Sequence, residues 1–180
     1  LGRDGAYVFA IDVSHRDETE IAGKKHNYQL YSGRKLLPSE LSDVDVSIAG
    51  YALARMQWHS NARFCGKTGA ATIAAEGGSK RILGEGSRIK LYPRTDPVVI
   101  MLVFSPDGER VLLGRSKSHP KNMYTALAGF VDQCESLEAA VRREVLEEVG
   151  VQVGAVQLLG SQPWPIGRAG SCELMIGAWA

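Results

Sequence analysis

The sequence has few cysteines, no long apolar run and no excess of one charge. Its three cysteines, at positions 65, 134 and 172 of 180 residues, are too few and too far apart for a disulfide framework, and they suit a reducing compartment. The longest apolar run, residues 98–104, is far too short to cross a bilayer, and the first residues show no basic-then-apolar leader pattern. These absences favour a protein that is neither secreted nor bound to a membrane.

The net charge of +1 excludes a generally polybasic nucleic-acid binder, yet the charge is unevenly distributed. It is −1 over residues 1–59, +6 over residues 60–121 and −4 over residues 122–180. A basic middle beside an acidic end suits an anion-binding wall next to a metal or carboxylate site. The alternative is a set of solvated surfaces that merely differ in charge.

The hydrophobic pattern predicts strands at residues 6–13, 156–159 and 173–178, and a hairpin made of residues 97–104 and 110–114 around a Ser-Pro-Asp-Gly turn. A helix is predicted over residues 36–58, and residues 60–90 are predicted to form a loop-rich module. The clearest helix covers residues 136–149, where Ser136 can cap the first turn and Gly150 can adopt the left-handed ending.

Three carboxylates interrupt the apolar side of this last helix. At about 100° per residue, Glu144, Glu147 and Glu148 share one arc with the side chains that should be buried. Like charges at i, i+4 destabilise a helix, and partial burial raises that cost, so a compensating cation is needed. Mg²⁺ is the natural candidate, because it takes oxygen ligands and no histidine or thiolate lies nearby. The alternative is a solvated acidic patch whose partners are Arg142 and Arg143.

The spacing of this segment matches a known signature. Gly129 is followed after five residues by Glu135, and after seven more by the run REVLEEVGV of residues 143–151. This pattern resembles the Nudix hydrolase signature, G-x5-E-x7-R-E-U-x-E-E-x-G-U with U aliphatic, at every fixed position. The resemblance implies an α+β fold, the Nudix αβα sandwich, and hydrolysis of a nucleoside diphosphate linked to another moiety.

The resemblance also implies roles for individual residues. Arg143 orients the glutamates through ion pairs, and Mg²⁺ or Mn²⁺ is bound by the side chains of Glu144, Glu147 and Glu148 and by the backbone carbonyl of Ala128. We expect Arg143 and the three glutamates to be catalytic, with Glu147 nearest the attacking water.

A second stretch of the sequence indicates the class of substrate. Residues 161–165 read SQPWP, and the two prolines present Trp164 as a large aromatic face on which a flat ring can stack, unless Trp164 is simply part of the core. SQPWP at this offset resembles the tag of NADH pyrophosphatases, and the runs YPRTDPVVIM at residues 92–101 and LAGF at residues 127–130 are similar to theirs. The resemblance implies hydrolysis of NADH or NAD⁺ to NMN(H) and AMP. The substrate contacts that it implies are Tyr92, Phe130 and a loop formed by Ser161, Gln162, Pro163, Trp164 and Pro165.

Other properties follow from the same resemblance. Members of this subfamily also remove NAD caps from RNA, and the basic middle segment is compatible with contacts to RNA phosphates. Relatives often form homodimers and occur in the cytoplasm, in peroxisomes and in other organelles. We therefore expect a dinucleotide or NAD-capped RNA as substrate, a homodimer, and a cytoplasmic, peroxisomal or other organellar location.

Two departures limit the resemblance. Relatives carry a four-cysteine zinc ribbon before the YPR run, whereas residues 63–69 (RFCGKTG) keep only Cys65 and have Thr68 where a second cysteine is expected. A structural zinc needs about four nitrogen or sulfur ligands, so we expect no zinc. Relatives also continue beyond the strand that matches residues 172–178, so we expect the Nudix domain to be truncated at its C-terminal end.

These observations divide the chain into three parts. We expect a small α/β region, partly like the N-terminal part of NADH pyrophosphatases, at residues 1–59, a degenerate zinc-ribbon-like module at residues 60–92, and the Nudix domain at residues 93–180. Two other functions remain open: a Nudix diphosphatase for another substrate such as ADP-ribose, and an inactive nucleotide-binding domain.

Overall fold

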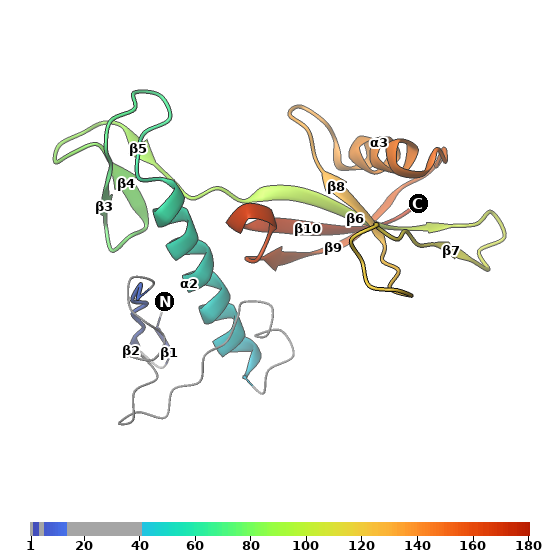
Figure 1. Ribbon diagram of the computed structural model, residues 1–180, viewed down its shortest axis with the longest axis horizontal. Helices are drawn as coiled ribbons and strands as arrows, with labels where there is room; N and C mark the ends of the chain where they lie inside the picture. The colour runs from blue at the N-terminus through green and yellow to red at the C-terminus, as the bar shows by residue number, and fades with distance from the viewer. Residues whose placement is uncertain (1, 4–5, 14–40) are drawn as a thin grey trace. The chain divides into compact units, whose positions relative to one another are not determined.

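The computed structural model describes residues 2–3, 6–13 and 41–180 of the chain. The chain divides into two compact units (Figure 1). Unit 1 comprises Leu1–Arg94 and Pro165–Ser171, and unit 2 comprises Thr95–Trp164 and Cys172–Ala180. The domain boundaries expected from the sequence stay predictions.

Unit 1 begins with a minimal sheet and a long helix. β1 (Gly2–Arg3) pairs with β2 (Ala6–Tyr7) in antiparallel fashion. The strand predicted over residues 6–13 is wrong beyond residue 7, because residues 8–13 are exposed and pair with no strand of the described chain. α2 (Asp43–Asn61) begins after Ser42, whose side chain accepts a hydrogen bond from a backbone N–H of the first turn at 3.2 Å. This confirms the predicted helix from residue 43 onward, and residues 36–40 lie outside the described residues.

A small antiparallel sheet follows α2. Its strands are β3 (Ile73–Ala75), β4 (Lys80–Ile82) and β5 (Lys90–Leu91), paired in that order. The sequence predicted only a loop-rich module here, because strands of two or three residues are too short to show a periodicity. The likeness of this module to a zinc ribbon stays a prediction.

Cys65 is buried in the turn that precedes this sheet. Its sulfur accepts hydrogen bonds from the Thr68 hydroxyl and from the backbone N–H groups of Lys67 and Thr68, and these bonds lower the pKa of the thiol. Thr68 therefore interacts with Cys65 directly, through a hydrogen bond. Across the described ranges, no three or more His, Cys, Asp or Glu side chains are grouped so that they could hold a metal ion.

Arg81 links this small sheet to α2. It donates hydrogen bonds to the hydroxyl of Thr72 at 2.6 Å, to the carbonyl of Thr72 at 2.8 Å and to Nδ1 of His59 at 2.9 Å. Because arginine can only donate, His59 accepts at Nδ1 and donates its Nε2–H to the carbonyl of Gly78 at 2.9 Å. Thr72 is buried and donates its hydroxyl to the carbonyl of Ala62 at 2.6 Å. One guanidinium thus organises a satisfied polar network inside unit 1.

Unit 2 is built on a five-stranded mixed sheet (Figure 1). Its strands are β6 (Asp96–Phe104), β7 (Val111–Leu112), β8 (Leu127–Phe130), β9 (Gln157–Trp164) and β10 (Glu173–Trp179). The order is β7-β6-β10-β9, and β8 also pairs with β6. The β6–β10 pair is parallel and the other pairs are antiparallel. The α+β class and the hairpin of β6 and β7 are confirmed.

The strands predicted at residues 156–159 and 173–178 are also confirmed, as β9 and β10. However, β9 continues to Trp164, so the prediction of a loop at residues 161–165 is wrong for residues 161–164. Pro163 fits in this strand because β9 lies at the edge of the sheet, where a missing N–H costs no ladder hydrogen bond. The strand geometry makes alternate residues of this segment point to opposite faces.

α3 (Leu137–Val149) covers one face of the sheet and has the ends that the sequence predicts. Ser136 accepts a hydrogen bond from the Ala139 N–H at 3.2 Å, and Gly150 ends the helix with φ at 70°. Its apolar side packs on the odd-numbered residues of β6, so the even-numbered residues face away from α3. The buried core consists of Val99, Met101, Val103, Leu127, Ala140, Val141, Val145 and Ala178. Neither α3 nor any other described helix is long and apolar enough to cross a bilayer.

The network around Arg81 generates a stability prediction. Arg81→Leu leaves the buried Thr72 oxygen atoms with fewer donors and Nδ1 of His59 with none, so the variant is expected to lose about 2 kcal/mol of unfolding free energy. Urea denaturation followed by circular dichroism measures the loss, and Arg63→Leu, at an exposed position of the same unit, is the control. Equal stability of the two variants contradicts the proposed role of Arg81.

Candidate active site

Arg143 is the centre of a charged cluster on α3. Its guanidinium donates two hydrogen bonds to the carboxylate of Glu135, at 2.8 and 2.9 Å, and one each to Glu144 at 2.9 Å and Glu147 at 3.2 Å. A further bond, from Nη2 to the backbone carbonyl of Phe130, measures 2.9 Å and links α3 to β8. A single side chain therefore holds the helix, the strand and the loop between them in one arrangement.

This cluster is not a solvated acidic patch. The side chains of Arg143, Glu135 and Glu144 are 26%, 15% and 14% exposed, while Glu147 is 59% exposed. Charge-assisted bonds in partly buried surroundings are stronger than those in water. Arg142, the other partner that the sequence suggested for the acids, instead donates to the carbonyls of Gly154 and Glu138.

The ionisation of Glu135 and Arg143 is coupled. Hydrogen bonding from Arg143 holds the pKa of the Glu135 carboxyl below its ordinary value, and the backbone N–H of Asp132, which donates to Glu135 at 3.1 Å, acts in the same direction. In return, Glu135 first and Glu144 second raise the pKa of Arg143 above its ordinary value. Both partners are therefore charged over the whole physiological range of pH.

Gly129 is required by the position of Glu144. A Cβ atom placed on Gly129 would stand 1.9 Å from the carboxyl carbon of Glu144 and about as close to both of its oxygen atoms. Any larger residue at this position must displace the carboxylate. The first glycine of the recognised signature thus makes room for one of its glutamates.

The three predicted metal ligands of α3 supply suitable donors but are not gathered into one group. Glu144 and Glu147 both contact Arg143, and Glu148 lies one position beyond Glu147 on the same arc. Glu147 and Glu148 are exposed, so a cation from solvent can approach them. An all-oxygen set of carboxylates suits a hard divalent ion in chemical terms.

The free edge of β8 brings a further oxygen towards this cluster. Within a strand, the carbonyls of residues two apart point to the same side. The carbonyl of Phe130 points to Arg143, and the N–H of Val131 points to Pro97 of β6 at 3.1 Å. The carbonyl of Ala128 therefore points, like that of Phe130, away from β6 and towards the side on which Arg143 lies.

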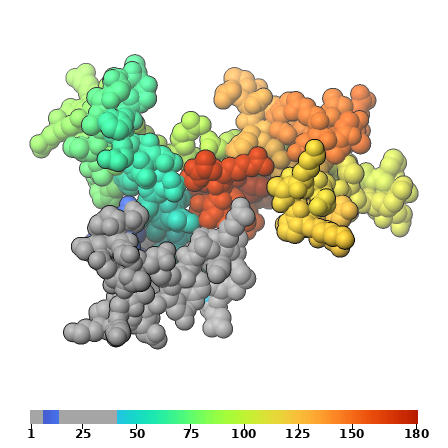
Figure 2. Space-filling view, in the orientation of Figure 1, coloured from blue at the N-terminus to red at the C-terminus, as the bar shows by residue number. Residues whose placement is uncertain are grey.

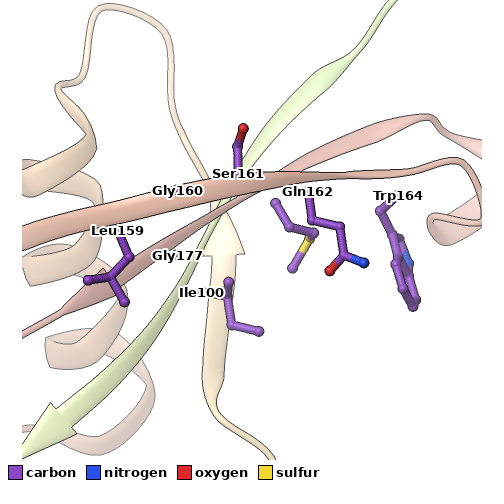
Figure 3. A pocket seen from close by; sticks show the side chains of 8 residues that line it. Ile100, Leu159, Gly160, Ser161, Gln162, Trp164 and Gly177 are labelled. Atoms are coloured by element: carbon purple, nitrogen blue, oxygen red, sulfur yellow. The ribbon is translucent and has the colours of Figure 1, made fainter. Parts of the chain in front are cut away.

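The other face of the sheet contains a hollow of about 450 Å³ (Figure 3). Figure 3 shows the side chains of Ile100, Gln162 and Trp164 on one side of the sheet, with the side chain of Ser161 pointing to the other. The complete lining consists of Ile100, Leu159, Gly160, Ser161, Gln162, Trp164, Met175 and Gly177. Gln162 and Trp164 therefore lie together, as the sequence predicts, and Ser161 contributes no side chain to the hollow.

Two glycines that the sequence analysis missed create this hollow. Gly160 of β9 pairs with Gly177 of β10, which in turn pairs with Ile100 of β6. A Cβ atom on Gly160 would meet nothing within 4 Å, so the space above the pair is open. Glycine inside a strand often marks such a close approach or a ligand site, and this was the signal in the sequence.

Phe130 lies on the same face as the hollow. The strand register places Phe130, Val98, Met175 and Gln162 in one row across β8, β6, β10 and β9. Three strand spacings of about 4.8 Å separate the ends of the row by about 14 Å. The predicted contacts Phe130 and Gln162 thus mark the two sides of one surface, opposite to α3.

Two predicted substrate contacts belong to unit 1 instead. Tyr92 is exposed there, and Pro165 lies against α2, where a Cβ atom on Gly50 would stand 3.2 Å from the Pro165 ring. Trp164, Gln162 and Phe130 belong to unit 2, and the substrate contacts predicted for Tyr92 and Pro165 stay predictions. Pro163 points, like Ser161, to the α3 side of the sheet.

The depressed pKa of Glu135 predicts a pH-dependent contribution to stability. Because its folded-state pKa is below the ordinary value of 4.5, the ion pair stabilises the protein fully above about pH 4.5, and the stabilisation is lost as the pH falls through the folded-state pKa. Glu135→Gln should therefore be destabilised at pH 7, and its deficit should shrink in acid. Urea denaturation from pH 7 to pH 3 measures this, with Glu138→Gln in the first turn of α3 as control. A deficit that does not change with pH contradicts the role of this ion pair.

Comparisons with known proteins agree with the signature. Residues 94–172 match the family model of the NUDIX domain. Nudix hydrolase 19, chloroplastic, of Arabidopsis thaliana is 46% identical over 138 residues, which cover 76% of this chain and 32% of that protein. The human NAD-capped RNA hydrolase NUDT12 is 46% identical over 148 residues, covering 78% and 31%. The human mitochondrial NAD(P)H pyrophosphatase NUDT13 is 41% identical over 165 residues, covering 92% and 45%.

The chain thus spans between about a third and just under half of the length of these relatives. The match to the family model includes the segment that holds Gly129, Glu135, Arg143 and the three glutamates of α3. Residues 94–172, a little under half of the chain, are thus similar to the NUDIX domain.

Proposed function

We propose that this chain is a divalent-metal-dependent diphosphatase that hydrolyses NADH or NAD⁺ to NMN(H) and AMP. The observation that carries the proposal is the carboxylate cluster held by Arg143 at the free edge of β8, in the same unit as an apolar hollow that contains Trp164. The names of the relatives, NAD-capped RNA hydrolase and NAD(P)H pyrophosphatase, support the same substrate class.

Glu144, Glu147 and Glu148, with the carbonyl of Ala128, are the residues that would hold Mg²⁺ or Mn²⁺. A bound divalent ion would neutralise charge on the diphosphate and make phosphorus more open to attack. Arg143 keeps Glu144 and Glu147 oriented through its bonds to Glu135, which leave the guanidinium little freedom to move. The expectation that no zinc is bound at Cys65 is kept, since one thiol supplies a quarter of the usual ligands.

The reaction needs a base that water can reach. Glu147 is the most exposed carboxylate of the cluster, and we assign it the proton of the attacking water. The water oxygen forms a bond to one phosphorus of the diphosphate, the bond from that phosphorus to the bridging oxygen breaks, and the bridging oxygen leaves with the second phosphate. The products are two mononucleotides, each with a terminal phosphate.

The hollow opposite α3 suits a flat ring of the substrate. Trp164 supplies an aromatic surface, Gln162 supplies donors and an acceptor for ring substituents, and the absence of side chains at Gly160 and Gly177 leaves the space open. Phe130 stands at the β8 end of the same face, next to the edge where the carboxylates lie. A dinucleotide that passes over this edge can therefore contact both sites.

The remaining properties stay predictions. They are activity on NAD-capped RNA, a homodimer, and a location in the cytoplasm, in peroxisomes or in another organelle. Two relatives are named as chloroplastic and mitochondrial proteins, which keeps the organellar alternative open. The second candidate function is a Nudix diphosphatase for ADP-ribose, and the third is an inactive nucleotide-binding domain.

Release of AMP from NADH tests the enzymatic proposal. In the presence of Mg²⁺ the chain is expected to produce AMP, and Glu147→Gln is expected to lower kcat at least about 100-fold, because a positioned base contributes about that much. Glu138→Gln removes a carboxylate from the opposite side of α3 and should retain full activity. Metal-dependent binding of NADH without any turnover would favour the inactive binding domain.

The hollow generates a separate prediction about the substrate. Trp164→Ala should lower kcat/KM for NADH about tenfold, because loss of stacking on one ring costs about 1–3 kcal/mol. Gly160→Val, which fills the hollow with a side chain that favours strands, should do the same. Trp179→Ala, at an exposed tryptophan of β10, is the control. If Trp164→Ala leaves NADH cleavage intact, the ADP-ribose alternative gains the advantage.

A further inference from the structure

A basic loop connects β7 to β8 in unit 2. Residues 115–121 contain Arg115, Lys117 and Lys121, and no acidic residue occurs between Glu109 and Asp132. Two backbone hydrogen bonds between Gly114 and Thr125, of 2.8 and 2.9 Å, close the base of the loop. Figure 2 shows this loop, in yellow, at the surface of the protein. The loop is therefore a positively charged projection attached directly to the strand that carries Ala128 and Phe130.

The loop is structured by its own hydrogen bonds. The guanidinium of Arg115 donates to the carbonyls of Pro120 at 3.4 Å and His119 at 3.3 Å. The N–H of His119 donates to the carbonyl of Ser116 at 3.0 Å, and the Ser116 and Ser118 hydroxyls are 2.9 Å apart. Arg115 is thus used to hold the loop, and its fixed position leaves the lysines to act on a ligand.

Lys117 and Lys121 are the cations that are available for a ligand. Both are exposed, and within residues 2–3, 6–13 and 41–180 neither ammonium group has a hydrogen-bond or ion-pair partner. Figure 1 shows the loop, in gold, on the opposite side of β6 from α3, which is the side of the sheet that also contains the hollow. Two unpaired positive charges on this side favour a ligand with several negative charges.

We propose that Lys117 and Lys121 bind backbone phosphates of an RNA chain whose 5′ end is the dinucleotide held at the α3 site. The inference rests on the proposed function. A free dinucleotide has only its two bridging phosphates, which a divalent ion held by the carboxylate cluster would neutralise, so nothing on it remains for the lysines. An RNA attached to the adenosine half adds one negative charge per nucleotide. These two residues thus distinguish NAD-capped RNA from free NADH.

The distance along β8 is suitable for this role. Thr125, at the base of the loop, is three residues from Ala128, which corresponds to about 10 Å along a strand. The first few nucleotides of a bound RNA can therefore pass from the edge of β8 to the loop. Single-stranded RNA that is bound through Z phosphates shows a logarithmic salt slope of about −0.7Z, so two contacts contribute about 1.4 to the slope.

The test compares two substrates and two double variants. Lys117→Ala/Lys121→Ala removes the proposed contacts, and Arg63→Ala/Arg110→Ala removes two exposed cations elsewhere. With a short NAD-capped single-stranded RNA, the wild type should lose about sevenfold more kcat/KM than the lysine variant when the salt rises from 50 to 200 mM. The kcat/KM of the lysine variant for NADH should equal that of the wild type at each salt concentration. The arginine variant should behave as the wild type on both substrates.

Every other outcome contradicts the inference. If the wild type and the lysine variant show equal salt slopes on capped RNA, or if the arginine variant loses as much as the lysine variant, the inference is wrong. If the wild type cleaves NADH but not capped RNA, the inference is wrong and the proposed function stands. If NADH is not cleaved at all, the proposed function fails and the inference fails with it.

Discussion

The bonds of Arg143 are the constraint on which the rest of this site depends. One guanidinium contacts Glu135 from the loop, Glu144 and Glu147 from α3 and a backbone carbonyl of β8. Its planar fork fixes the direction of each bond, which an ammonium group could not do. Without it, the partly buried acids would repel each other and α3 would lose its polar link to the sheet. The same residue therefore serves folding and the placement of the carboxylates that we propose to be catalytic.

β8 connects the two sites because alternate residues of a strand face opposite sides. The backbone of Gly129 faces α3 and accommodates Glu144, whereas Phe130 lies on the face with the hollow. The free edge of the strand offers carbonyls to the charged cluster. A short strand of four residues thus provides a carboxylate cradle, an oxygen donor and an aromatic contact. Its glycine and its register with β6 are both necessary for this arrangement.

Local signals in the sequence were sufficient for α3, since Ser136 and Gly150 act within their own turns, and for the hairpin of β6 and β7. Pairing between distant segments was not visible. The extension of β9 to Trp164 depends on hydrogen bonds to β10, and the small sheet of unit 1 has strands too short for any pattern. The boundary between the two units that falls between Trp164 and Pro165 was not visible either. Periodicity cannot reveal such a division.

The separation of the two faces allows chemistry and specificity to change independently. In the proposed function, the carboxylates and Arg143 would serve the diphosphate, which every candidate substrate contains. The hollow depends on the paired glycines Gly160 and Gly177, where one added side chain fills the space without touching α3. Substrates such as NADH and ADP-ribose share the diphosphate and one nucleoside, and they differ in what is attached to the other phosphate. Under the proposed function, the choice between them would therefore lie on the face of the sheet that α3 does not cover.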